Sequence, residues 1–195
     1  MTTTFCLANG VSRAGLDLAV LSQNGKIYGC NALYKDYEPD VLIATDAPIS
    51  GRIQDSGYSK RKVFYTRRCM PGSGARQIPQ KYYGSSSGPV CAALAAIDGA
   101  QQIYLLGYDL GPNCIGKFNN VYAGTEFYKA TGTPQTFTGN WIKQLITVIK
   151  DFPRVRWTRV YGTTTMKHSE FDQLLNLEHL DMELFLVRIN NQKEG

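Results

Sequence analysis

The chain has 195 residues, of which 43% are hydrophobic and 19% charged, with a formal net charge of +5. This length and composition are typical of one globular domain with its own core, and they exclude a disordered or low-complexity protein. No apolar stretch approaches the roughly 20 residues needed to span a bilayer. The N-terminus also lacks a basic segment followed by a long apolar one, so neither a membrane span nor a signal peptide is expected.

Short, largely apolar segments predict strands at 4–7, 26–30, 41–44 and 102–106. β-Branched and aromatic residues predict a strand at 62–66, and alternation of side chains predicts one at 155–160. Apolar residues at helical spacing predict helices at 16–21, 49–58, 87–100 and 140–150. Segments 67–84 and 110–139 are rich in loop-forming residues and predict insertions without regular structure. In the tail we expect a helix over 169–180 and a last strand over 184–189.

The alternation of strands and helices predicts a single α/β domain over 1–195, Rossmann-like, with a mainly parallel sheet and flanking helices. Ligands of such sheets bind beyond the carboxyl ends of the strands. The residues that directly follow each apolar run are therefore the candidates for a binding site.

The turn after the first strand is Asn9-Gly10-Val11-Ser12-Arg13. Glycine allows close backbone approach, and the polar side chains suit ribose, base or phosphate. The dinucleotide fingerprint Gly-x-Gly-x-x-Gly is absent, and a plain tight turn is the alternative. Asn31, after the second strand, either reads a base edge or caps a helix.

The strongest predicted helix begins after Ser85-Ser86-Ser87-Gly88. Exposed amides and the helix dipole favour an anion at such a start, and the hydroxyls add donors. Capping alone would need only one serine. The surplus of hydroxyls favours phosphate binding.

Three side chains are candidates for catalysis: Asp46, Asp109 and His168. Asp46 and Asp109 each follow a buried strand, where a carboxylate can hold a sugar hydroxyl, act as a base or bind Mg²⁺. A turn or cap role is the alternative for each. His168 follows a polar loop and is a candidate general base. His179 falls in the predicted tail helix and is interpreted as structural.

The five cysteines are odd in number and widely spaced, and they form no Cys-x-x-Cys pair or Cys/His cluster: Cys6, Cys30, Cys69, Cys91 and Cys114. No metal site is predicted from them. Those in apolar segments are expected to behave as small hydrophobic side chains. The pattern predicts a reducing, cytoplasmic compartment.

Much of the positive charge falls between Lys60 and Arg68, with Arg76 and Lys81 nearby. Such a cluster either binds phosphate or nucleic acid, or forms a solvated loop that keeps the protein soluble. The sequence is compatible with an oligomer.

Two segments resemble known families. The opening of bacterial sialyltransferases of the glycosyltransferase-42 type is similar to the first segment, LANGVSRAGLDLAVLSQNGKIYGCNALYKDYEPDVLIATD. The later Ser-Gly helix, strand and Gly-x-Asp of that family are similar to the second segment, GSSSGPVCAALAAIDGAQQIYLLGYDL. The same layout occurs in hydroxymethylpterin pyrophosphokinase-like proteins of archaeal type. The opening also resembles uncharacterised proteins of tailed bacteriophages, which would place this protein in a bacterial host's cytoplasm.

The resemblance covers about residues 4–46 and 84–110. It implies a Rossmann-like fold that binds a nucleotide-activated donor, with Asn9 and Asn31 near sugar or base. It places Tyr122 and Tyr128 near the leaving phosphate. The sequence departs from the sialyltransferase pattern at Val11, where that family has proline, and at 136–140, where the family's catalytic histidine is missing. Catalysis would then require another base.

These observations predict a transferase acting on a nucleotide-activated donor, with glycosyl transfer first among the reactions. One alternative is a pterin-type pyrophosphokinase or nucleotidyl enzyme, which would use Mg²⁺ on Asp46 and Asp109. Another is a non-catalytic phage accessory or virion-associated protein that keeps a nucleotide-binding fold.

Overall fold

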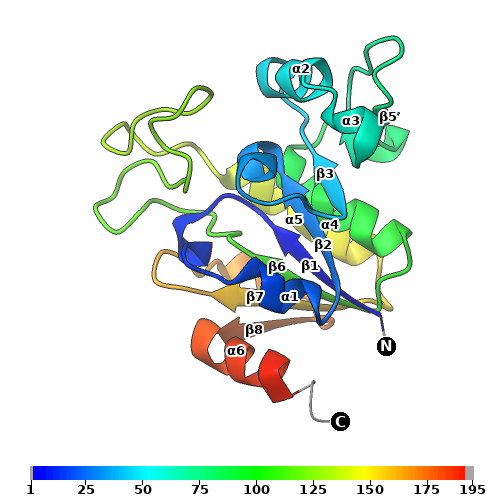
Figure 1. The fold of residues 1–195 in the computed structure, drawn as a ribbon. Helices are drawn as coiled ribbons and strands as arrows, with labels where there is room; N and C mark the ends of the chain where they lie inside the picture. The colour runs from blue at the N-terminus through cyan, green and yellow to red at the C-terminus, as the bar shows by residue number, and fades with distance from the viewer. Residues whose placement is uncertain (1, 192–195) are drawn as a thin grey trace.

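The computed structural model describes residues 2–191 as a three-layer α/β structure around one eight-stranded sheet (Figure 1). Every neighbouring pair of strands is parallel, and the order is β5-β4-β3-β2-β1-β6-β7-β8. The strands are Thr3–Leu7 (β1), Lys26–Cys30 (β2), Val41–Ile43 (β3), Val63–Thr66 (β4), Arg76–Gln77 (β5), Gln102–Leu106 (β6), Arg156–Tyr161 (β7) and Leu177–Asp181 (β8). The predicted Rossmann-like fold class is confirmed.

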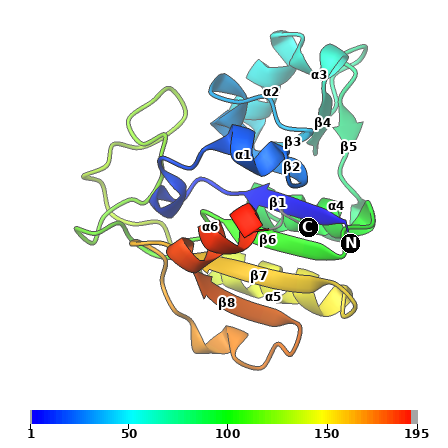
Figure 2. The same ribbon diagram turned by 60° about the horizontal axis from the view of Figure 1, so that its bottom comes forward.

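Helices cover both faces of this sheet, which is why its central strands are apolar on both sides. Ser87–Ile97 (α4) and Gly139–Asp151 (α5) pack on one face. Leu18–Ser22 (α1), Ala47–Asp55 (α2), Tyr58–Arg61 (α3) and Met182–Asn191 (α6) lie on the other face (Figure 2). Along β1 the side chains alternate accordingly, because Cys6 faces α4 while Phe5 and Leu7 face the opposite layer.

The order of strands reverses at β1. The chain runs outward from β1 through β2, β3, β4 and β5, then crosses back so that β6 lies on the other side of β1. This topological switch point leaves a crevice at the carboxyl ends of β1 and β6, where ligands of such sheets bind. The residues that follow β1 and β6 are Ala8–Gly10 and Gly107–Asp109.

The tail corrects two predictions. The predicted helix over 169–180 is a single 3₁₀ turn, Ser169–Phe171, followed by strand β8, so His179 lies in a strand. The predicted strand over 184–189 is part of α6. β8 is an edge strand whose side chains are mostly exposed, so its sequence LEHLD lacks the apolar run of a central strand. In α6, Phe185 and Ile189 are buried four residues apart, which is helical spacing.

The segment 67–84 is also more structured than expected. It contains β5 and the 3₁₀ turn Gln80–Tyr82. In contrast, 110–138 holds no helix or strand among the described residues, apart from an isolated bridge between Lys117 and Pro134, and α5 begins at Gly139. Figure 1 shows this long insertion extending beyond the carboxyl ends of the strands.

The prediction for the cysteines in apolar segments is also confirmed. Cys6, Cys30 and Cys91 are buried within the core, and all five cysteines are free thiols. Within residues 2–191, no helix combines the length and the apolar character needed to cross a bilayer.

Candidate functional site

A cleft of about 410 Å³ opens at the switch point, and we call it the switch-point cleft. It is bounded by the ends of β1, β2 and β6, the start of α4 and the insertion 110–139. Nine of the predicted site residues line it: Asn9, Gly10, Asn31, Asp46, Ser86, Ser87, Gly88, Asp109 and Tyr128. Residues far apart in the chain thus meet where the parallel-sheet rule places a ligand.

Five predicted residues do not line the cleft: Ser12, Arg13, Ser85, Tyr122 and His168. Ser12 and Arg13 instead bind residues that do line it. The carbonyl of Ser85 accepts a hydrogen bond from Arg67 at 2.7 Å. The Nε2 atom of His168 lies 2.7 Å from the Leu110 carbonyl oxygen. Because that carbonyl can only accept, Nε2 carries the proton, and His168 acts there as a structural donor.

Asp109 is buried and its carboxylate is surrounded by donors. Oδ2 accepts from the Ser12 amide at 3.0 Å, from Asn119 Nδ2 at 3.1 Å and from Thr164 Oγ1 at 2.6 Å. Oδ1 accepts from the hydroxyls of Ser12 and Thr165. These bonds join the turn after β1, the insertion and the turn after β7. The lone pairs of Asp109 are therefore committed to holding the cleft together.

Gly10 is needed because of Asp109. A Cβ atom at position 10 would lie 2.4 Å from Asp109 Cγ and 2.5 Å from the Gly107 carbonyl oxygen. Its φ of −63° is open to any residue, so space rather than conformation demands glycine. The sequence interpretation anticipated close approach to a ligand, whereas the observed close approach is to the end of β6.

Arg159 on β7 binds the backbone that follows β6, and the sequence interpretation missed it. Its side chain is fully buried; Nε and Nη2 donate to the Tyr108 carbonyl at 3.0 and 2.8 Å, and Nη2 also lies 3.2 Å from the Asp109 carbonyl. Burial lowers the pKa of Arg159 to about 10. An arginine in the middle of the predicted strand 155–160 was the signal that could have found it, since buried cations require specific partners.

The two predicted tyrosines come together around Arg13. The guanidinium of Arg13 donates to the Asn9 side-chain oxygen at 3.4 Å and to the Tyr122 hydroxyl at 3.2 Å. Asn9 Nδ2 in turn donates to the Tyr128 hydroxyl at 3.2 Å, and the two tyrosine rings are 6.0 Å apart. Burial raises the pKa of Tyr122 to about 12 and that of Tyr128 further still. Both phenols therefore remain protonated at neutral pH and can act as hydrogen-bond donors.

Asn31 is held in place by Ser87 and Thr45. Ser87 Oγ donates to Asn31 Oδ1 at 2.9 Å and accepts from the Thr45 amide at 3.0 Å. Asn31 has a φ of 53°, a left-handed conformation that asparagine tolerates better than most residues. Its Nδ2 donates to no other residue of the described chain, and Asn31 lines the cleft. The free amide is thus available to a ligand.

The start of α4 adds further donors. Ser86 is the N-cap residue, and its side chain makes no capping bond within the described chain. The amides of Ser87 and Gly88 in the first turn have no acceptor within the helix, and both residues line the cleft. Free amides at the positive end of the helix dipole favour an anion. Of the three serines, only Ser86 and Ser87 reach this position.

Asp46 differs from Asp109. It precedes α2 and is exposed, and its carboxylate accepts no hydrogen bond from residues 2–191. It lines the switch-point cleft and also a neighbouring pocket. Asp46 is therefore the carboxylate in the cleft whose oxygens are available to a substrate.

The predicted Mg²⁺ pair can be tested on these contacts. A cation ligand needs free oxygen lone pairs, and those of Asp109 are occupied by five protein donors. In the described chain, no three His, Cys, Asp or Glu side chains gather as a metal site. The residues present therefore do not fit a metal ion held jointly by Asp46 and Asp109.

The insertion 110–139 is fastened over the cleft at several points. Asn119 Oδ1 accepts from the Val11 amide at 2.8 Å, and the Val121 amide donates to the Asn9 carbonyl at 2.8 Å. Glu126 pairs with Arg52 on α2 at 2.7 Å. The insertion also contributes side chains to the cleft that the sequence interpretation did not single out: Phe118, Asn119, Asn120, Phe127, Lys129 and Thr136.

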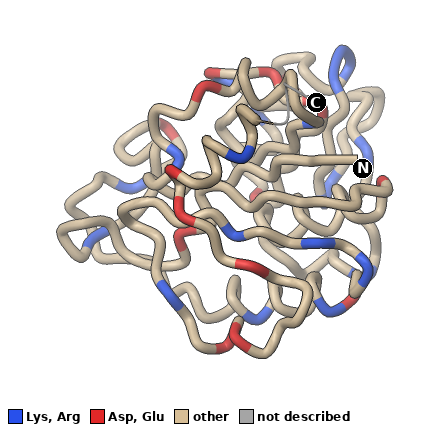
Figure 3. The backbone as a smooth tube through the Cα atoms, turned by 90° about the horizontal axis from the view of Figure 1, so that it is seen from below, with Lys and Arg blue, Asp and Glu red and all other residues tan. Residues whose placement is uncertain are grey.

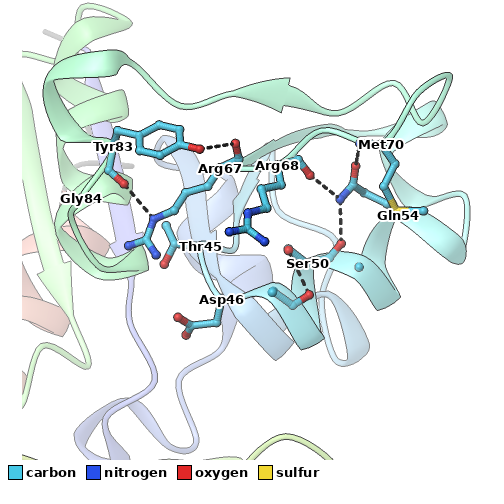
Figure 4. Close-up of a pocket in the computed structure, with 11 residues that line it drawn as sticks. Thr45, Asp46, Ser50, Gln54, Arg67, Arg68, Met70, Tyr83 and Gly84 are labelled. Atoms are coloured by element: carbon cyan, nitrogen blue, oxygen red, sulfur yellow. Dashed lines mark hydrogen bonds between the residues drawn. The ribbon is translucent and has the colours of Figure 1, made fainter.

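A second cavity of about 560 Å³, which we call the arginine pocket, shares Asp46 with the cleft. Figure 4 shows the residues that line this pocket. Its walls are α2, the segment after β4 and the turn before α4. Asp46 and the side chains of Arg67 and Arg68 contribute to its lining.

The basic stretch that suggested nucleic-acid binding is divided in the fold. Arg61 and Lys62 each lie 3.3 Å from Glu38, and Arg67 is bound by the carbonyls of Tyr83 and Ser85. Figure 3 shows basic and acidic residues interspersed around the backbone. Three of the five basic residues in Lys60–Arg68 are therefore bound to other protein groups.

Comparison of the chain with protein-family models, with curated proteins and with solved structures finds no match. The fold and the geometry of the two cavities are thus the observations on which its function can be argued.

Proposed function

We propose that the protein is a transferase that binds a nucleotide-activated donor in the switch-point cleft, with glycosyl transfer as the reaction. The observation that carries this proposal is the meeting of free donors and one free carboxylate at the switch point. The amides of Ser87 and Gly88, the Asn31 side-chain amide and the Asp46 carboxylate all border the same cleft.

Each group has a distinct part in the proposed reaction. The first turn of α4 binds a phosphate of the donor and stabilises the charge that develops on it as the nucleotide leaves. Asn31 hydrogen-bonds the sugar or the base. Tyr128, whose hydroxyl accepts a hydrogen bond from Asn9, also lines the cleft and donates to the donor substrate. Asp46 takes the proton of the attacking hydroxyl.

The contacts of Asp109 and His168 set the proposal apart from the alternatives. A pyrophosphokinase using Mg²⁺ on Asp46 and Asp109 would need lone pairs that Asp109 has committed to five protein donors. Of the three residues considered as a base, Asp46 alone has a free side chain at the cleft. A non-catalytic nucleotide-binding module would share the binding residues but show no turnover.

The free thiols, including exposed Cys69 and Cys114, fit a reducing compartment, and we propose a cytoplasmic location.

Calorimetry against a panel of CMP-, UDP- and GDP-sugars tests the binding step. We expect one class of nucleotide sugar to bind and the Asn31→Ala variant to bind it about tenfold more weakly, since one hydrogen bond to a charged or polar ligand is lost. Asn140→Ala, an exposed asparagine at the start of α5 that does not line the cleft, is the matched control. Absence of binding for every nucleotide, or equal binding by wild type and Asn31→Ala, contradicts the proposal.

A further inference from the structure

The arginine pocket contains two cations that no acidic residue neutralises. Neither Arg67 nor Arg68 pairs with an acidic residue anywhere in the described chain, 2–191. Arg67 donates through Nε and Nη2 to the carbonyls of Tyr83 and Ser85, at 2.8 and 2.7 Å. The guanidinium of Arg68 makes no hydrogen bond with residues 2–191. Figure 4 shows the side chains of Arg67 and Arg68 pointing to the side of the pocket where Thr45 and Asp46 lie.

The wall that carries Arg68 is held by a buried glutamine. Gln54 on α2 is 5% exposed, and its Nε2 donates to the carbonyls of Ser50 and Arg68 at 3.2 and 3.1 Å. Its Oε1 accepts from the Met70 amide at 2.7 Å and the Ser73 hydroxyl at 2.9 Å. Three of these four bonds, those with Arg68, Met70 and Ser73, tie α2 to the segment after β4. The backbone under Arg68 is therefore fixed before any ligand arrives, which lowers the entropic cost of binding.

Asp46 connects this pocket with the switch-point cleft. It contributes to the lining of both cavities, at the point where β3 ends and α2 begins. A base that serves a group-transfer reaction must reach the acceptor on one side and the donor on the other. The position of Asp46 between two adjacent cavities meets that requirement.

We propose that the arginine pocket is the acceptor subsite, and that it takes a small hydroxylated molecule carrying a carboxylate or a phosphate. This inference rests on the proposed function, because it presumes a donor in the cleft. Arg68 would bind the anionic group of the acceptor through a bidentate, charge-assisted contact. Arg67, fixed by two carbonyls, adds positive potential at the same wall.

The reaction then balances without a further reactant. The hydroxyl of the acceptor gives its proton to the Asp46 carboxylate, and its oxygen forms a bond to the anomeric carbon of the donor. The bond between that carbon and the phosphate oxygen breaks, and its electron pair leaves with the nucleotide. Asp46 afterwards releases the proton to solvent, to which it is exposed.

Nuclear magnetic resonance titration of the full chain tests the assignment. The probes are glucuronate and glucose 6-phosphate, with uncharged glucose as the reference, and CMP, UMP, GMP and AMP as probes of the cleft. We expect the two anionic sugars to shift the backbone amides of Ala47, Gly51 and Arg68, and glucose to shift none of them. We expect a nucleotide to shift the amides of Ser87 and Gly88.

The variant Arg68→Ala separates the two sites. We expect it to weaken binding of the anionic sugars about tenfold or more, because charge-assisted hydrogen bonds are lost, while nucleotide affinity stays within about twofold. The exposed Arg154→Ala, which lies at neither cavity, controls for a general change of charge. Equal binding of the anionic sugars by wild type and Arg68→Ala overturns the assignment.

Two other outcomes are also decisive. An equal loss of nucleotide binding in Arg68→Ala would mean that the arginine serves the donor, and it overturns the acceptor assignment alone. If the anionic sugars bind through Arg68 but no nucleotide shifts Ser87 or Gly88, the proposed function fails, and the acceptor role fails with it.

Discussion

An aspartate follows each of the strands β3 and β6 and lines the same cleft, but the two differ in exposure and in hydrogen bonding. At the end of β6, Asp109 is 3% exposed and accepts hydrogen bonds from Ser12, Asn119, Thr164 and Thr165. At the end of β3, Asp46 is exposed and accepts none from the described chain. The sequence context of the two is alike, but only packing decides which carboxylate is left for a ligand. We assign a structural role to Asp109 and a chemical role to Asp46.

The largest expected difference in stability is between the variants Asp109→Asn and Asp46→Asn. Asp109→Asn places an amide group against donors and leaves some of them without an acceptor, so we expect a loss of about 3 kcal/mol in the free energy of unfolding. Asp46→Asn should change it by less than about 0.5 kcal/mol, as for other exposed sites. Urea denaturation followed by circular dichroism measures both. Similar losses in the two variants would remove the distinction between them.

The turn after β1 offers a second comparison, between two glycines. Gly10→Ala brings a Cβ atom to 2.4 Å from Asp109 Cγ, and we expect it to cost about 2 kcal/mol as an overpacked site. Gly51 lies inside α2, and a Cβ atom there meets nothing within 4 Å. Gly51→Ala should stabilise the protein by about 0.5 kcal/mol or more, because alanine favours a helix. Thermal unfolding of both variants measures whether the two changes in stability have opposite signs. No loss of stability in Gly10→Ala would show that Asp109 and the Gly107 carbonyl can shift at little energetic cost.

The smallest expected effect concerns the insertion over the cleft. Glu126 pairs with Arg52 and Lys35, at 2.7 and 3.6 Å, and all three side chains are more than a third exposed. Glu126→Gln should therefore cost no more than about 0.5 kcal/mol in global stability. It should speed amide hydrogen exchange locally, at residues 125–129, without changing exchange in β1 or β6. Unchanged exchange in the insertion would mean that the hydrogen bonds of Asn119 and Val121 suffice to hold it.

The strands β1, β2, β3 and β6 were predictable because each is a short, largely apolar and buried segment between two layers of helices. The same reasoning failed at the tail, where β8 is an exposed edge strand and α6 buries only Phe185 and Ile189 fully. Local sequence favours neither structure there, and the outcome depends on the neighbouring β7. The two-residue β5 was missed for the same reason, since it exists only by pairing with β4.

The candidate site was predictable in position but not in the division of roles. The parallel-sheet rule predicted that Asn9, Asn31, Asp46, Ser87 and Asp109 lie at one edge of the sheet, and in the structure they line one cleft. It could not show that Asp109 is saturated by donors from three different segments, because those contacts are non-local. Nor could it show that His168 does not line the cleft and instead donates to the Leu110 carbonyl. Only the packed structure determines which polar groups remain free.

The most direct test of the central claim is the rate at which nucleotide is released from the nucleotide sugar that binds best, in wild type and in Asp46→Asn. We expect the wild type to turn over in the presence of glucuronate or glucose 6-phosphate. In Asp46→Asn the rate should fall about 100-fold or more, as for loss of a general base, while the affinity for the donor and the unfolding free energy stay unchanged. Undiminished turnover in Asp46→Asn would contradict the account.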